Sequence, residues 1–105
     1  MTQKDFAIAK EVKAKVSQVV DLVDIRVFGS RARGDGDEYS DMDVFIEVGR
    51  LDKKQKEKIR EIVWEIGFNN SIHISPLIYT ISEITESPLR SSPVVKCILE
   101  EGITV

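Results

Sequence analysis

The strongest constraint on the fold lies in residues 41–48, where the side chains alternate strictly between two kinds. Successive side chains of a β-strand point to opposite faces of a sheet, so this alternation predicts a strand. One face is wholly apolar and must be covered, whereas the other carries acidic groups beside one aromatic ring. The apolar face comprises Met42, Val44, Ile46 and Val48, and the other comprises Asp41, Asp43, Phe45 and Glu47.

Segments with the helical period lie on both sides of this strand. A first amphipathic helix is expected from Asp5 to about Asp21, and a second from Lys53 to Ile66, with Asp52 as its N-cap and Gly67 as its stop. A last helix should begin at Ser87-Pro88 or at Ser92-Pro93 and end at Gly102. Its apolar positions are Val94, Val95, Ile98 and Leu99.

Two further short segments are typical of strands, residues 25–28 and residues 72–79. Pro76 cannot donate to a sheet ladder, which places the second of them at a sheet edge. Residues 103–105 are a candidate for a few additional strand residues. The expected fold class is therefore α/β (α+β), a small mixed β-sheet with helices packed on it, in one domain spanning residues 1–105.

The composition is that of a folded protein without a membrane span. Hydrophobic residues make up 42% of the 105 residues and charged residues 31%, and no run of about 18 apolar residues occurs. The first ten residues lack the features of a signal peptide. The single Cys97 excludes an internal disulfide framework and fits a reducing, cytoplasmic setting. A net charge of −3 gives no general attraction to nucleic acids.

The strand over residues 25–28 ends at Gly29-Ser30, and a short helical turn is expected to follow from Arg31. Such an exit exposes unpaired backbone N–H groups, which favour an anionic ligand such as phosphate. Glycine lets the phosphate oxygens approach the backbone, and the serine hydroxyl supplies another donor. Arg31 and Arg33 add charge and forked donors that suit phosphate.

Asp41 and Asp43 stand two residues apart on the same strand face, so their Cα atoms should lie roughly 6.5–7 Å apart. Neighbouring carboxylates repel each other, and a shared cation removes that cost. Mg²⁺ prefers a few carboxylates together with phosphate oxygens and water. The turn and the strand together therefore predict a site for phosphoryl or nucleotidyl transfer.

Gly29-Ser30, the following residues and then Asp41-Met42-Asp43 resemble the signature of the minimal nucleotidyltransferases (MNT domains) of the polymerase-beta-like superfamily. The resemblance covers nearly the whole chain and implies that family's palm fold. It implies that Gly29 and Ser30 bind the triphosphate of ATP and that Asp41 and Asp43 ligate Mg²⁺. Such proteins are often the antitoxin half of HEPN/MNT toxin–antitoxin pairs, which implies transfer of AMP to a tyrosine of a helical HEPN partner.

One departure from that family pattern concerns a third carboxylate. Active members commonly carry it on the next strand, where this sequence offers His73 or Ser75 instead. His73 is a candidate metal-near ligand or weak general base. Two hypotheses therefore stay open, an active nucleotidyltransferase and a nucleotide-binding antitoxin that acts only by complex formation. A pure scaffold subunit is a third alternative, and oligomerisation through apolar helix surfaces is expected.

Overall fold

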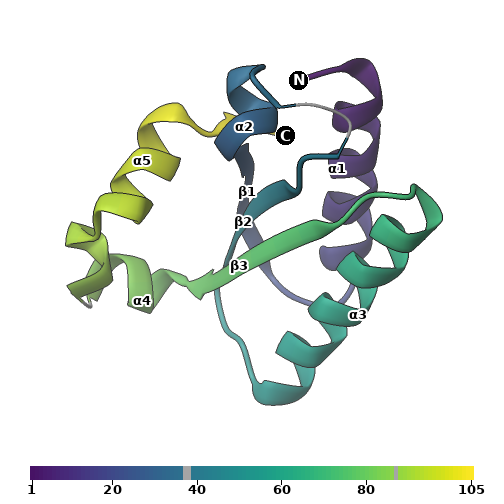
Figure 1. Ribbon diagram of the computed structural model, residues 1–105. Coiled ribbons are helices and arrows are strands. Elements are labelled where there is room, and N and C mark those ends of the chain that lie inside the picture. Colours follow the sequence, from purple (N-terminus) through teal and green to yellow (C-terminus); the bar gives the residue numbers. More distant parts are fainter. Residues whose placement is uncertain (37–38, 87) are drawn as a thin grey trace.

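The computed structural model describes residues 1–36, 39–86 and 88–105. Its centre is a four-stranded sheet with the order β3-β2-β1-β4 (Figure 1). The strands are β1 (Leu22–Phe28), β2 (Met42–Val48), β3 (Ile74–Thr80) and β4 (Ile103–Thr104). β1 pairs antiparallel with both β2 and β4, while β2 and β3 run parallel. The mixed sheet and the edge position of the Pro76 strand are thus confirmed.

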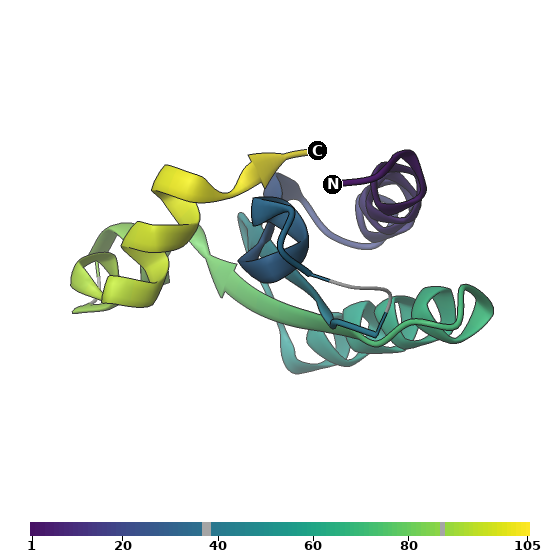
Figure 2. The ribbon, with the colours of Figure 1, turned by 45° about the horizontal axis from the view of Figure 1, so that its top comes forward.

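Four of the helices form two pairs that lie in different parts of the molecule. The helices are α1 (Gln3–Val16), α2 (Gly29–Arg33), α3 (Lys53–Asn69), α4 (Ile81–Glu86) and α5 (Pro93–Glu101), with a 3₁₀ helix over Pro88–Ser91. In both views α4 and α5 lie at the opposite end of the molecule from α1 and α3 (Figure 1 and Figure 2). Among the described residues, no helix combines the length and apolarity that crossing a membrane would need.

The apolar face of β2 packs in the main core between α1, α3 and the other strands. Its members include Val12, Val16, Val27, Val44, Ile46, Ile59 and Ile66. Phe45 points to the other face, where it is fully buried against Ile84, Val95 and Ile98 of α4 and α5. Burying a Phe side chain contributes about 2–3 kcal/mol, so this smaller core attaches the C-terminal helices to the sheet.

Both long helices begin with a capping box, which explains where they start. Thr2 and Asp5 exchange backbone and side-chain hydrogen bonds at α1, and Asp52 and Gln55 do the same at α3. The first helix was expected to run from Asp5 to about Asp21, but it begins earlier and ends at Val16. The valines beyond Val16 fit the helical period, yet the chain turns there and β1 begins three residues before the predicted Ile25.

Two further expectations need correction. Gly67 does not stop α3, which continues to Asn69. A Cβ at Gly67 would lie 2.7 Å from the Ile72 carbonyl oxygen, so the glycine permits a close approach of helix and chain. The last helix begins at Ser92-Pro93, as one of the two alternatives predicted, and ends at Gly102. α4 and the 3₁₀ helix were not predicted from the sequence.

Candidate active site

The chain leaves β1 directly into α2 at Gly29, whose φ of +76° is accessible mainly to glycine. In the β1–β2 register Phe28 is the partner of Asp43, which brings this turn beside the acidic strand. A Cβ on Gly29 would collide with the carboxylate oxygen of Asp43. Gly29 and Asp43 therefore face each other across a contact that leaves no room for a side chain at position 29.

Ser30 organises the loop that follows. Its carbonyl oxygen accepts hydrogen bonds from the backbone N–H groups of Gly34, Asp35 and Gly36 at 3.0, 3.1 and 3.1 Å. Gly34 adopts a left-handed conformation, with φ of +83°, at the end of α2. Residues 34–36 thus curl tightly around the Ser30 carbonyl group.

Asp41 lies at the entrance to β2 and pairs with the histidine predicted near it. The Nδ1 atom of His73 lies 3.4 Å from Oδ2 of Asp41, and both side chains are more than half exposed. The backbone N–H of Met42 donates to the His73 carbonyl oxygen at 2.9 Å, which fixes the two segments side by side. The structure therefore brings His73 to the acidic strand, where it contacts Asp41.

The surroundings of Asp43 shift the pKa of its carboxyl group. Partial burial raises the pKa of Asp43 above its ordinary value, and the negative charge of Asp41 raises it further. The positive charge of Arg33, and that of His73 when its ring is protonated, act in the opposite direction. The net result is a raised pKa, so that the ionised form of Asp43 is less favourable than that of an isolated carboxylate in water.

The two arginines predicted for phosphate binding occupy different surroundings. Arg33 is exposed and pairs with Asp35 at 3.2 Å, and its charge acts on Asp43. Arg31 is largely buried and pairs with Asp5 of α1 at 2.7 Å. Its Nε also donates to the Ser40 carbonyl oxygen at 2.9 Å. Arg33 is thus the arginine on the side of the acidic pair, whereas Arg31 is directed toward α1.

Position 75 stands where a third carboxylate would complete the site. Ser75 of β3 is the direct partner of Asp43 in the parallel β2–β3 register. Neighbouring strands lie about 4.8 Å apart, so the Ser75 side chain stands next to Asp43 on the same face. Of the two candidates from the sequence, Ser75 adjoins Asp43 and His73 adjoins Asp41.

The acidic side chains suit a cation that also binds a ligand better than a cation that is coordinated by protein groups alone. Within residues 1–36, 39–86 and 88–105, no three His, Cys, Asp or Glu side chains gather as a metal site. Two carboxylates remain, one of them destabilised by the other. Mg²⁺ commonly takes one or two carboxylates and completes its shell with phosphate oxygens and water, so Asp41 and Asp43 fit it.

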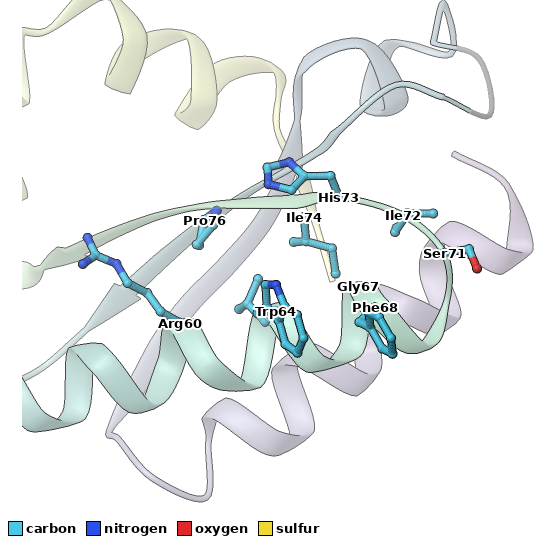
Figure 3. A pocket seen from close by; sticks show the side chains of 10 residues that line it. Arg60, Trp64, Gly67, Phe68, Ser71, Ile72, His73, Ile74 and Pro76 are labelled. Atoms are coloured by element: carbon cyan, nitrogen blue, oxygen red, sulfur yellow. The ribbon is translucent and has the colours of Figure 1, made fainter.

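An apolar groove of about 640 Å³ runs between α3 and β3. Trp64 and Phe68 form one wall, with exposures of 66% and 69% and stacked rings whose centroids are 5.2 Å apart. Figure 3 shows the two rings side by side on α3, with His73 across the groove. Because His73 also contacts Asp41, the groove reaches the edge of the candidate site.

A glycine turn that faces an Asp-x-Asp strand on a mixed sheet is the arrangement expected of a nucleotidyltransferase domain. A family model described as nucleotidyltransferase domain matches residues 7–105. A Methanocaldococcus jannaschii protein that bears the name of a protein adenylyltransferase is 44% identical over 75 residues, covering 69% of this chain and 76% of that protein. The chain therefore belongs to the nucleotidyltransferase domain family.

Solved structures agree on the fold. A minimal nucleotidyltransferase superimposes with a TM-score of 0.64 at 20% identity, covering 94% of this chain and 90% of that one. A toxin–antitoxin protein crystallised with AMP-PNP gives a TM-score of 0.55 at 18% identity, covering 89% of this chain and 68% of that one. The minimal nucleotidyltransferase fold expected from the sequence is confirmed.

We expect Asp43→Asn to raise the Tm of the metal-free protein slightly at neutral pH. The folded-state pKa of Asp43 is raised, so ionisation destabilises the fold as the pH rises through the interval between the unfolded and folded pKa values. The gain should shrink as the pH falls toward the ordinary value of 3.8 and vanish below it, where Asp43 is neutral in both the folded and the unfolded protein. Thermal melts over a pH series measure this, with the exposed Glu57→Gln as control. A lower Tm for Asp43→Asn at neutral pH would contradict it.

Ser75→Asp should strengthen Mg²⁺-dependent triphosphate binding several-fold and lower the Tm of the metal-free protein. The new carboxylate stands beside Asp43, where it repels that group without a cation and adds a ligand with one. Titration calorimetry with Mg²⁺ and AMP-PNP measures the affinity. Ser82→Asp, on the exposed surface of α4, should change neither quantity. An unchanged affinity in Ser75→Asp would show that position 75 lies outside the metal shell.

Proposed function

We propose that the protein binds ATP with Mg²⁺ and transfers AMP to a hydroxyl group of a partner protein. The observation that carries this proposal is the contact of the Gly29 turn with the Asp43 carboxylate. A triphosphate held at the turn would meet the acidic pair within one side-chain length. The family of the chain and the name of its Methanocaldococcus jannaschii relative support the same reaction class.

In this proposal Gly29 and Ser30 bind the triphosphate through the backbone and the serine hydroxyl, while Arg33 adds positive charge. Asp41 and Asp43 hold the cation, which supplies charge neutralisation on the phosphates. The acceptor oxygen bonds to the α-phosphorus, and pyrophosphate leaves with the electrons of the broken P–O bond. The hydroxyl proton passes to a base, and His73 is our candidate because it lies beside Asp41.

The acceptor we favour is a tyrosine of a HEPN-type toxin, with this chain as the antitoxin in the cytoplasm. Solved structures with the same fold include toxin–antitoxin proteins, which supports a protein partner. The alternative is an antitoxin that neutralises its partner by complex formation alone. Ser75 at the place of a third carboxylate is the observation that favours this alternative.

Radiolabelled ATP, Mg²⁺ and a candidate HEPN partner separate the two functions. An active enzyme should label the partner, and Asp41→Ala with Asp43→Ala should reduce labelling about a hundredfold or more, because loss of the cation removes several kcal/mol of transition-state stabilisation. Asp21→Ala changes an exposed acidic residue outside the site and should keep full activity. Stable complex formation without labelling by the wild type would favour the alternative.

We further propose that the Trp64–Phe68 wall of the groove contacts a partner chain, either a second copy or the toxin. Two stacked aromatic rings that are two-thirds exposed represent apolar surface that association would bury. Trp64→Ser with Phe68→Ser should reduce the mass in solution, alone or with the partner, and change the Tm of the isolated chain little. Glu61→Ser on the same helix is the control. The proposal is contradicted if the wild type is monomeric and the double variant binds the partner as tightly as the wild type does.

A further inference from the structure

Asp5 is the one charged residue that is buried in the part of the chain that the structure describes. It lies in the first turn of α1, far in sequence from the candidate site, and is 4% exposed. Its Oδ1 accepts from Nη1 of Arg31 at 2.7 Å. The side chains of Arg31 and Asp5 are only 10% and 6% exposed. Asp5 and Arg31 thus form a largely buried ion pair between α1 and α2.

The other carboxylate oxygen of Asp5 is committed to the start of α1. Oδ2 accepts from the Thr2 backbone N–H at 3.1 Å, and the Asp5 backbone N–H donates to the Thr2 hydroxyl at 3.1 Å. This capping box fixes the position of the carboxylate. Asp5 therefore presents a preset acceptor to Arg31 and holds the guanidinium in a defined orientation.

The same guanidinium reaches the residue that precedes the acidic pair. Nε of Arg31 donates to the Ser40 carbonyl oxygen at 2.9 Å. Arg31 directly follows Ser30 of the turn, and Ser40 directly precedes Asp41. One planar group therefore connects α1, the Gly29-Ser30 turn and the entrance to β2, at the point where the loop between them returns to the sheet.

We propose that Asp5 and Arg31 are positioning residues that set the distance between the phosphate-binding turn and Asp41. This inference rests on the proposed function. It assigns Arg31 to the support of the site and leaves Arg33 as the arginine on the ligand side. A buried ion pair adds little net stability because desolvation offsets its attraction, whereas its fixed geometry suits alignment. Lysine has no forked donor and cannot reach both acceptors in this way.

Arg31→Lys is the decisive variant, since it retains a charge for Asp5 and loses the Nε donor to Ser40. We expect its Kd for AMP-PNP with Mg²⁺ to rise about tenfold, with a Tm close to that of the wild type. Arg26→Lys is a matched control. Arg26 also joins a carboxylate and a carbonyl, Asp24 at 2.8 Å and the Leu99 oxygen at 2.8 Å, but these acceptors belong to β1 and α5 and not to the turn or the entrance to β2. The Kd of Arg26→Lys for AMP-PNP with Mg²⁺ should equal that of the wild type.

Asp5→Asn separates positioning from direct phosphate binding by Arg31. Asparagine keeps an acceptor for Thr2 and removes the charge that orients the guanidinium. A positioning role predicts weaker AMP-PNP binding in this variant, whereas an Arg31 that contacts phosphate would be released by the substitution and bind as well as before or more tightly. Asp5→Asn also supplies the measurement if Arg31→Lys does not fold.

The outcomes are distinguishable from failure of the proposed function. A wild type that binds no AMP-PNP with Mg²⁺ overturns the proposed function and this inference together. A wild type that binds, with Arg31→Lys binding equally well, overturns the inference alone. Unchanged or tighter binding in Asp5→Asn also overturns it. Weaker binding in both variants, with melting curves that show a folded protein at the assay temperature, supports it.

Discussion

The antiparallel register of β1 and β2 is the constraint on which the site depends. Pairing Phe28 with Asp43 places the end of one strand beside the start of the other, so the Gly29 turn and the acidic strand meet without any element between them. A register shift of one residue would turn every side chain of β2 to the opposite face. The wholly apolar face of β2 opposes such a shift, because it would expose the residues that α1 and α3 bury. Core packing thus secures the position of Asp43.

The two faces of the sheet differ: one packs against the main core, and the other carries the candidate site. α1 and α3 cover the face that holds the main core, while α4 and α5 cover only the Phe45 region of the other. The part of that second face beside the α2 turn carries Asp43 and Ser75, which are both half-buried. Covering it further would exclude a ligand, and leaving Phe45 bare would expose a large ring. The small second core therefore permits an acidic site close to a folded sheet.

The sequence alone predicted those parts that depend on periodicity and on single-residue chemistry. The alternation in residues 41–48 predicted β2, which spans Met42–Val48, and the missing N–H of Pro76 predicted the edge position of β3. Gly67 was misjudged because glycine also serves close packing, and only the tertiary structure shows the Ile72 carbonyl beside it. The Asp5–Arg31 pair was missed for a similar reason. Twenty-six positions separate the two residues, and no local pattern marks a contact of that range.

The serine at position 75 explains why the candidate site is compatible with two functions. A third carboxylate beside Asp43 would bind the cation more tightly, but it would add a third negative charge next to a group whose pKa is already raised by burial and by Asp41. Serine at position 75 avoids that repulsion and keeps the metal-free protein more stable. In the proposed function, a bound cation would then obtain more of its ligands from the triphosphate and water. Metal and nucleotide should consequently bind as a unit, so a site with two carboxylates favours joint binding whether or not transfer follows.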